Sequence, residues 1–313
     1  MSVTCTLRPM GSAVLFPGQG SQSLGMADPW VSHEAGADVL AEVSATLGRD
    51  VVAGCHDEAA LAATAFVQPA LLACGVAAFR VLRAEGLGDV VGVAGHSLGE
   101  FAALVAAEAV SLTDALSVVL IRGEAMQRAG DEHPGTMTAL LGMGTEDAEA
   151  LCEEARGVGV LVVANRNSPA QVVASGDVEA IERLEALVKE RKSRAIRLQV
   201  AGAFHSELMR PAVGPVVEAL AAIEIRDPVF PIAENVTGEL VTSAARLRDL
   251  LGRQVVSPVL WETGIRALGA AGADRFLEAG AGDVLTRMMK RIVPEATARA
   301  VGSPQAAREA LTT

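Results

Sequence analysis

The sequence predicts an α/β protein in which a small subdomain is inserted into a larger one. Two short apolar runs, at positions 13–16 and 90–94, each lead into a glycine-containing loop or turn, as strands of a parallel sheet buried on both faces do. The segment 134–201 has a separate rhythm of strands and helices. Of the 313 residues, 50% are hydrophobic, which is enough to build one large domain or two coupled ones.

The first strand is followed by a glycine-rich loop, PGQGSQSLGM at 17–26, and then by helical patterns. The most apolar of these covers 64–82, where we expect a buried helix that opens near Pro69. We do not expect it to span a membrane, because Gln68, Pro69 and Arg80 interrupt it and it falls short of the ~20 apolar residues that a span requires.

The inserted segment is predicted to run strand, helix, strand, strand, helix, strand, which is the order of a ferredoxin-like fold. The periodicities indicate strands at 136–143, 159–165, 170–176 and 193–200 and helices at 145–155 and 177–192. The last strand alternates Ile196, Leu198 and Val200 with polar residues, so we expect it to be half-exposed.

The predicted domain limits follow from this pattern. Residues 1–133 and 202–313 form the larger α/β body, and 134–201 form the ferredoxin-like insert. After the insert, the chain returns to the body and ends with a strand at 274–280 and a helix that follows Gly282.

The composition excludes several classes of function. The net charge of −12 argues against nucleic-acid binding, and so does an aromatic content of 3% without any tyrosine. The four cysteines show neither CxxC nor zinc-site spacing, which predicts no metal site and suits a reducing cytoplasm: Cys5, Cys55, Cys74 and Cys152. The N-terminus lacks the pattern of a secretory signal. We expect a cytoplasmic protein with no nucleic-acid or membrane partner.

The turn between the strand at 90–94 and the helix after it carries the pattern G-x-S-x-G, with Ser97 between Gly95 and Gly99. This is the nucleophile elbow, in which bulky residues two before or two after the serine would clash. The serine oxygen then lies at a helix start, where free N–H groups and the helix dipole can stabilise an oxyanion. The alternative is an ordinary strand-to-helix turn that Ser97 caps.

A serine nucleophile needs a base, and His205 is the candidate. It lies where a strand gives way to a helix that we expect Ser206 to cap, at the edge of the sheet that also holds the elbow. His96 should point away from Ser97. The remaining histidines are expected to be solvated: His33, His56 and His133. The order serine then histidine, with 108 residues after His205 and no further histidine, fits an ordinary esterase badly.

Arg122 lies in the most apolar part of a helix that begins at a capping box, Ser111 to Asp114. No acid lies three or four residues from it, so its charge needs a distant acid or a ligand. One interpretation is an arginine that snorkels to the surface or pairs with another element. The other is a fork that holds a substrate carboxylate through two hydrogen bonds.

Together these features resemble the malonyl-CoA:acyl-carrier-protein transacylase family and the related acyltransferase domains of polyketide synthases. The resemblance covers nearly the whole chain and rests on FPGQGSQ at 16–22, GHSLGE at 95–100, RGEAMQ at 122–127, NRNSPAQVVASG at 165–176, GAFHS at 202–206, RQVVSPVLW at 253–261 and LEAGAGDVLT at 277–286. It implies an α/β-hydrolase-like body with an inserted ferredoxin-like subdomain.

The resemblance also implies roles for individual residues. Ser97 is the nucleophile, His205 the base, and the main-chain carbonyl of Gln254 orients the histidine, which removes the need for a triad acid. The oxyanion hole comes from the backbone N–H groups of Gln19 and Leu98. The substrate-binding residues are Arg122, which would hold the malonyl carboxylate, together with Met126, Asn165 and Phe204. No cofactor is implied beyond the CoA thioester substrate.

The implied reaction is a two-step transfer of malonyl from malonyl-CoA to Ser97 and then to the phosphopantetheine thiol of an acyl carrier protein, by a protein that we expect to be monomeric. Phe204 is typical of members that use malonyl, whereas Arg166 stands where a phenylalanine is frequent. The alternatives are a hydrolase that clears carrier proteins, a transacylase for another α-carboxyacyl-CoA and a non-catalytic docking module. The sequence leaves open whether fatty-acid or polyketide synthesis is served.

Because acyl carrier proteins are generally acidic and this chain is too, we expect a local basic patch to overcome long-range repulsion. Two clusters are candidates: Lys189, Arg191, Lys192 and Arg194 at the end of the insert's second helix, and Arg287, Lys290 and Arg291 on the helix after Gly282. Either one is equally interpretable as a solvated helix face.

Overall fold

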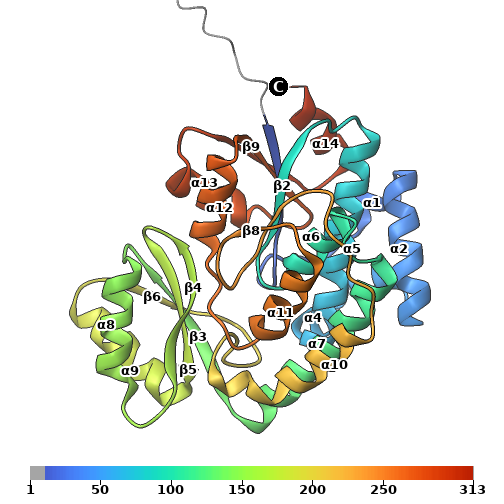
Figure 1. The fold of residues 1–313 in the computed structure, drawn as a ribbon. Helices are drawn as coiled ribbons and strands as arrows, with labels where there is room; N and C mark the ends of the chain where they lie inside the picture. The colour runs from blue at the N-terminus through green and yellow to red at the C-terminus, as the bar shows by residue number, and fades with distance from the viewer. Residues whose placement is uncertain (1–10, 313) are drawn as a thin grey trace, which may run out of the picture.

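A computed structural model describes residues 11–312. Its larger sheet has six strands, of which only the β7–β8 pair is antiparallel. Their spatial order is β10 (Thr297–Val301), β9 (Ala273–Ala279), β1 (Gly11–Phe16), β2 (Val90–Gly95), β7 (Ile232–Ala233) and β8 (Leu240–Val241). This sheet lies inside the larger body in Figure 1, and the predicted strands at 13–16, 90–94 and 274–280 correspond to β1, β2 and β9.

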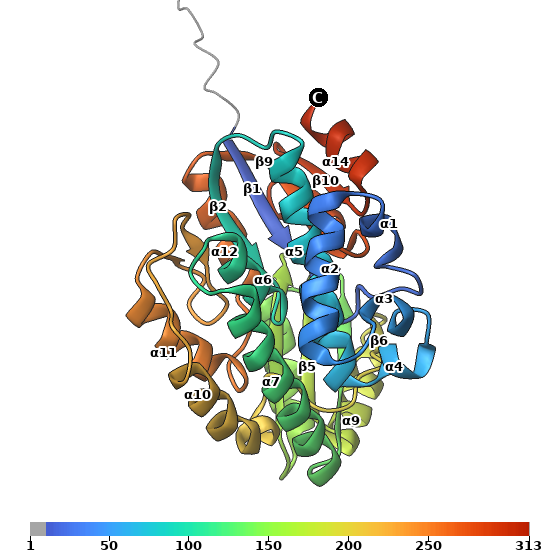
Figure 2. The same cartoon turned by 90° about the vertical axis from the view of Figure 1, so that its right-hand side faces the viewer.

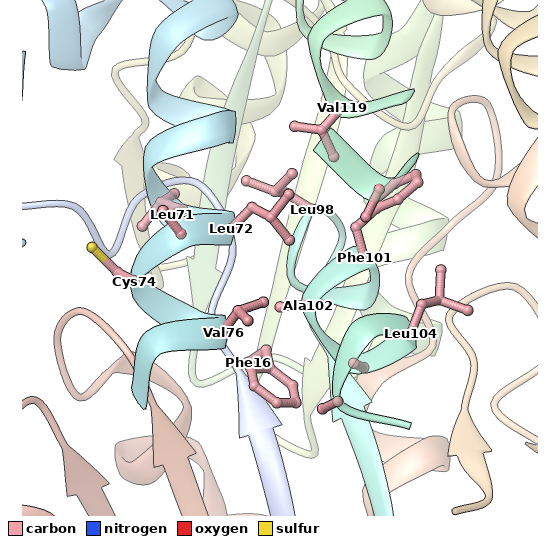
Figure 3. Packing of buried hydrophobic residues seen from close by; sticks show 14 of the residues in the cluster. Phe16, Leu71, Leu72, Cys74, Val76, Leu98, Phe101, Ala102, Leu104 and Val119 are labelled. Carbon is pink, nitrogen blue, oxygen red and sulfur yellow. The ribbon is translucent and has the colours of Figure 1, made fainter. Parts of the chain in front are cut away.

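Strand β1 is buried on both faces, as its unbroken apolar sequence predicts. Val14 and Phe16 point into one hydrophobic core and Ala13 and Leu15 into another on the opposite face, because successive side chains of a strand alternate. Figure 3 shows Phe16 packed beneath two helices, with Val76 on one and Ala102 on the other. The sheet is therefore the middle layer of a helix–sheet–helix body.

Helices cover both faces of the larger sheet. On the Phe16 side, α5 (Thr64–Ala84) and α6 (Gly99–Ala106) contact the strands, and α2 (Glu34–Leu47) and α7 (Leu112–Glu132) pack outside α5; Figure 2 shows α2 in front of α5. The opposite face carries α12 (Trp261–Ala270) and α13 (Val284–Ile292). The rest of the body comprises α1 (Asp28–Val31), α3 (Val51–Gly54), α4 (Glu58–Ala62), the 3₁₀ helix η1 (Glu207–Ala212), α10 (Val213–Ala221), α11 (Ala244–Gln254) and α14 (Pro304–Leu311).

Helix α5 corrects one prediction, because it begins at Thr64 and not near Pro69. Proline inside a helix loses a hydrogen bond at a cost of about 3 kcal/mol. Burial of Phe66 and Val67 ahead of the proline offsets this, since each fully buried side chain of this kind contributes about 1.5–3 kcal/mol. The helix is long and apolar enough to cross a membrane, yet 89% of its most apolar window is buried inside the protein, as in the core helix of a globular protein.

The second sheet has four antiparallel strands, β3 (Gly135–Leu141), β4 (Leu161–Ser168), β5 (Gln171–Asp177) and β6 (Arg194–Arg197), in the order β4-β5-β3-β6. With α8 (Thr145–Arg156) and α9 (Val178–Glu190) on one face, this is the ferredoxin-like arrangement that the sequence predicted. Figure 1 shows it at the lower left, beside the larger body. Its helices and strands all lie between residues 134 and 201. The limits of the inserted subdomain themselves remain a prediction.

The last strand of the insert is shorter than predicted. Its pairing with β3 begins at Arg194 and ends at Arg197. Beyond it, the N–H of Leu198 donates one further hydrogen bond to the carbonyl of Met137. The chain then runs toward the larger body, where the side chains of Leu198 and Val200 line a cavity. Their alternation with polar residues therefore reflects which side chains face this cavity and not the inner face of a strand.

Three of the four cysteines, Cys55, Cys74 and Cys152, are free and buried. Burial raises the pKa of the Cys55 thiol to about 11 and that of Cys152 to about 12, so both are neutral at physiological pH. Cys5 lies outside the described residues. Within residues 11–312, no group of three or more His, Cys, Asp or Glu side chains is arranged to hold a metal ion.

Candidate active site

Ser97 occupies the turn between β2 and α6 in the strained geometry that its neighbours predict. Its φ is 51°, in the left-handed region that non-glycine residues rarely adopt. A Cβ on Gly95 would lie 2.0 Å from the carbonyl carbon of Gly99, and a Cβ on Gly99 would lie 2.1 Å from the carbonyl oxygen of Phe16. Both positions therefore require glycine, and the turn is a nucleophile elbow.

His205 meets the serine from the loop between β6 and η1. Its Nε2 lies 2.7 Å from the Oγ of Ser97, and its Nδ1 lies 3.0 Å from the carbonyl oxygen of Gln254 and 3.1 Å from that of Ser257. Because two carbonyl oxygens can only accept, Nδ1 carries the proton and Nε2 is free to accept one from Ser97. The carbonyl of Gln254 was expected from the sequence, whereas that of Ser257 was not.

Burial lowers the pKa of His205 to about 3, and the positive charge of Arg122 acts in the same direction. The imidazole is therefore neutral at physiological pH, the form that a general base needs. Ser206, next to it, caps a helix as expected, but this helix is the 3₁₀ turn η1 and not an α-helix.

The other histidines take no part in this pair. The Nε2 of His96 lies 2.9 Å from the Oδ1 of Asn167, and its ring packs 5.4 Å from that of Trp261, so it turns away from the Ser97 hydroxyl as predicted. It nevertheless lines the cavity, which was not expected. The three remaining histidines sit at helix caps or on the surface: His33, His56 and His133.

Arg122 is 1% exposed and contacts the serine directly, so it does not snorkel to the surface. Its Nη2 donates to the Oγ of Ser97 at 3.1 Å and to the side-chain oxygen of Gln254 at 3.0 Å, and its Nη1 donates to that of Gln68 at 2.8 Å. All of these partners are neutral. The buried Nε has no hydrogen-bond partner among the described residues.

Burial lowers the pKa of Arg122 to about 10, with Glu100 opposing the shift, so the guanidinium stays charged at physiological pH. Burial and the neighbouring Glu234 raise the pKa of Glu100 to about 8, which leaves that carboxyl largely protonated near neutrality. Arg122 is therefore a buried cation that forms no hydrogen bond to an ionised group and has one N–H without a partner among the described residues. Such a site favours binding of an anion.

A cavity of about 220 Å³ opens above the serine. Its wall includes all but one of the predicted site residues: Gln19, Ser97, Leu98, Arg122, Met126, Asn165, Phe204 and His205. Gln254 lies behind the wall, where it contacts Ser97, Arg122 and His205. The insert adds Met137, Ala139 and Val173, and α13 adds Val284, Leu285 and Met288.

Both predicted oxyanion donors, Gln19 and Leu98, line the cavity, and one of them lies at a helix start. Leu98 is the N-cap residue of α6, where the helix dipole favours negative charge. The N–H groups of Gln19 and Leu98 donate no backbone or side-chain hydrogen bond within residues 11–312. The N–H of Ser97 itself is unavailable, because it donates to the Oδ1 of Asn235 at 2.7 Å.

Arg166 does not enter the cavity, although it stands between two residues that do. Asn165 and Asn167 line the wall, while Arg166 points outward and pairs with Glu149 at 2.7 Å. The alternation of side chains along β4 explains this difference. The arginine therefore does not contribute to the shape of the pocket.

Three buried polar residues beside the elbow were not assigned a role from sequence: Gln68, Glu100 and Asn235. Gln68 could have been noticed as the polar interruption of an apolar helix, and Glu100 as part of the GHSLGE motif. Asn235 follows the two-residue strand β7 and carries no local signal.

Comparison with known proteins agrees with this geometry. A family model described as acyl transferase domain matches residues 14–310. The malonyl CoA-acyl carrier protein transacylase of Escherichia coli (strain K12) is 40% identical over 303 residues, covering 96% of this chain and 98% of that protein.

Two solved structures superpose on nearly the whole chain. The acyl-carrier-protein S-malonyltransferase of Burkholderia pseudomallei 1710b has a TM-score of 0.93 at 36% identity, covering 97% of this chain and 100% of that one. A malonyl-transacylase in complex with its type II polyketide synthase acyl carrier protein also has a TM-score of 0.93, at 37% identity and with 96% and 99% covered. The chain described here therefore belongs to the acyl transferase domain family.

Proposed function

We propose that this protein transfers a malonyl group from malonyl-CoA to the phosphopantetheine thiol of an acyl carrier protein, through an ester on Ser97. The names of its relatives in E. coli and B. pseudomallei support this substrate and acceptor. The observation that carries the proposal is the Arg122 guanidinium, buried 3.1 Å from the Oγ of Ser97 with no ionised partner in hydrogen-bond contact. A carboxylate on the acyl group satisfies that charge, whereas an acetyl group leaves it unsatisfied.

In the first half-reaction, the Oγ of Ser97 attacks the thioester carbonyl carbon while its proton passes to the Nε2 of His205. The carbonyl oxygen becomes an oxyanion, which the N–H groups of Gln19 and Leu98 stabilise. Collapse of this intermediate breaks the C–S bond and leaves the malonyl ester on Ser97. The departing thiolate takes the proton from His205, and free CoA leaves.

The second half-reaction repeats these steps with a new thiol. The thiol of the carrier's phosphopantetheine gives its proton to the Nε2 of His205, and its sulfur attacks the ester carbonyl. Collapse breaks the bond to the Oγ of Ser97, which recovers its proton from His205. The carbonyls of Gln254 and Ser257 hold the imidazole in one tautomer through both half-reactions.

Of the two basic clusters, the one on α13 is better placed to meet an acidic carrier protein. The same helix lines the cavity through Val284, Leu285 and Met288. Lys290 and Arg291 are exposed and form no ion pair with any residue of 11–312, whereas Arg287 pairs with Asp283 at 2.7 Å.

The cluster at the end of α9 lies on the other side of the insert. Its helix packs on the sheet face that carries Leu140 and Val172, away from the cavity. Arg191 is paired with Glu154 at 2.6 Å, as Arg287 is with Asp283, so the place of each helix relative to the cavity is what separates the two clusters. We therefore favour α13 as the docking surface for the carrier.

The remaining expectations concern the setting of the enzyme. We expect it to act as a monomer in the cytoplasm, without a resident cofactor or metal and without membrane or nucleic-acid partners. The reaction exchanges one thioester for an ester and then for another thioester, so it needs no redox or metal chemistry.

Intact mass spectrometry tests the proposal. The protein is mixed with malonyl-, methylmalonyl- and acetyl-CoA separately, and then with a holo acyl carrier protein. We expect a malonyl adduct that disappears when the carrier gains the same mass. An adduct lost as free malonate in the presence of the carrier would indicate a hydrolase, and a preferred methylmalonyl adduct would indicate another extender unit.

A further inference from the structure

Asn235 holds the nucleophile turn from behind. Its Oδ1 accepts a hydrogen bond from the N–H of Ser97 at 2.7 Å, and its Nδ2 donates one to the carbonyl oxygen of Gly95 at 2.7 Å. One side-chain amide therefore bridges the two backbone groups on either side of His96. Reversing the amide would place like dipoles together at both contacts, so the two bonds fix its orientation.

The turn needs such a bridge, because its backbone is strained. A non-glycine residue with positive φ costs about 1–3 kcal/mol and persists only where the surroundings hold it. The φ of Ser97 is 51°. Side chains distant in the sequence bond both of its backbone groups: Asn235 accepts from the N–H, and the Nε2 of Gln254 donates to the carbonyl at 3.0 Å, which also accepts from the N–H of Glu100 at 3.1 Å.

Asn235 is itself fixed on both sides. Its N–H donates to the Oε1 of Glu100 at 3.2 Å, and its carbonyl accepts from the N–H of Leu260 at 2.8 Å. It follows β7, which runs parallel to β2, so the ends of the two strands lie at the same edge of the sheet. Asn235 is 2% exposed and does not line the cavity. Within residues 11–312 its side-chain amide bonds only to Ser97 and Gly95, so the effect of the amide on the reaction passes through the elbow.

We propose that Asn235 is a positioning residue that holds Ser97 in its left-handed conformation and, by engaging the Ser97 N–H, leaves the N–H of Leu98 as the oxyanion donor of the elbow. This rests on the proposed function, because the readout is formation of the malonyl ester. The role differs from a structural one in a measurable way: losing it slows the attack but leaves Arg122, and hence substrate binding, unchanged.

The test compares Asn235→Ala with Thr237→Val. The control removes two side-chain hydrogen bonds in the same loop without touching the elbow: the Thr237 hydroxyl donates to Glu234 and accepts from the N–H of Glu239. Rapid quenching followed by intact mass spectrometry gives the limiting rate of malonyl-enzyme formation and the malonyl-CoA concentration for half-saturation. We expect Asn235→Ala to lower the limiting rate by about 100-fold, the loss associated with misplacing a reacting group by about an ångström.

The half-saturating concentration should stay within about threefold of the native value, since the pocket is intact, and Thr237→Val should keep the native rate. A fall of less than about tenfold for folded Asn235→Ala, or an equal fall for Thr237→Val, overturns the proposal. A native protein that forms no malonyl-enzyme overturns the proposed function instead, so the two failures are distinguishable.

Should Asn235→Ala fail to fold, Asn235→Leu takes its place, because leucine fills the volume of the buried amide while removing both side-chain hydrogen bonds to the elbow. A fall of about tenfold or more in the limiting rate supports the proposal, and a smaller fall overturns it.

Discussion

The two sheets contribute to one cavity in different ways. The larger body supplies the polar groups next to the reacting bond, namely Ser97, His205 and Arg122. The inserted sheet supplies apolar side chains such as Met137 and Val173, together with the amides of Asn165 and Asn167. Chemistry and shape are thus divided between a parallel sheet with helix starts at its edge and an antiparallel sheet that forms one wall.

The difference follows from what each sheet offers. The end of a parallel strand leads directly into a helix N-terminus, where backbone N–H groups are free and a negative charge is stabilised. The two residues of the reacting pair, Ser97 and His205, both lie in the larger body. Each has a positive φ although neither is a glycine. An antiparallel sheet bonds its backbone groups within itself, so it offers only alternating side chains. Changes in the body should therefore act on rate, and changes in the insert on fit.

The largest effect is expected for Ser97→Ala. Without the hydroxyl no ester can form, so malonyl transfer should fall by at least about a thousandfold while the protein stays folded. Alanine keeps a Cβ at the strained φ, so the elbow is not relieved. The measurement is intact mass after incubation with malonyl-CoA, with thermal unfolding as the control for folding. An adduct of native yield on the variant would show that the nucleophile lies elsewhere.

The next largest effect is expected for Arg122→Ala. The charge-assisted bond to the substrate carboxylate contributes about 1.5–3 kcal/mol, so malonyl transfer should fall by about 10- to 150-fold. Acetyl-CoA has no carboxylate, and its rate should fall less, which raises the acetyl-to-malonyl ratio. Both rates are measured on one preparation. Equal falls for the two substrates would contradict the carboxylate role and leave Arg122 with a structural one.

Charge reversal compares the two regions directly as docking surfaces. Lys290→Glu with Arg291→Glu on α13 should raise the KM for the carrier protein by about tenfold, whereas Lys189→Glu with Lys192→Glu on α9 should change it by less than about twofold. Malonyl-enzyme formation is followed alongside, because a loss there would assign the α13 charges to malonyl-CoA. The reverse ranking of the two variants would move the docking site to the insert.

Much of the site was predictable because its constraints are local. The Gly95 and Gly99 positions follow from steric limits within five residues, and the absence of an acid near Arg122 follows from helix geometry. The order of elements in the insert was legible because each helix and strand has a clear period. These features depend on neighbours in the chain, which a single sequence contains.

The rest depends on contacts between distant segments. Asn235 lies 138 residues from Ser97 in the sequence, and Gln68 lies 54 residues from Arg122. No local sequence pattern could therefore predict either hydrogen bond. The predicted start of α5 was wrong, because local rules treat a proline as a helix boundary whereas burial in the tertiary structure outweighs the cost of Pro69 inside the helix. Leu198 and Val200 have the period of a strand but line the cavity, because the chain leaves the sheet after Arg197.

A smaller effect is expected on the insert side, from Val173→Ala. The valine is buried on the cavity wall, and its truncation enlarges the pocket by two methyl groups. We expect a rise of about threefold in the KM for malonyl-CoA at unchanged kcat, together with better relative use of a branched α-carboxyacyl-CoA. Steady-state kinetics with both substrates measures this. A loss confined to kcat would mean that the insert takes part in the chemistry.

The smallest effect concerns pH and should arise from the larger body alone. The base works in its neutral form, and an ordinary histidine of pKa about 6.5 would lose about 97% of that form at pH 5. Because burial and Arg122 lower the pKa of His205 to about 3, the protein needs no deprotonation of this group between pH 5 and 8. The kcat/KM for malonyl-enzyme formation should therefore change by less than about twofold between pH 5 and 7, below the range in which Glu100, with a pKa of about 8, ionises. Arg122→Ala removes one cause of the lowered pKa, so its acid limb should move to higher pH. A native profile that falls with a midpoint near pH 6.5 would contradict the neutral, buried base, and an unmoved limb in the variant would remove Arg122 as a cause.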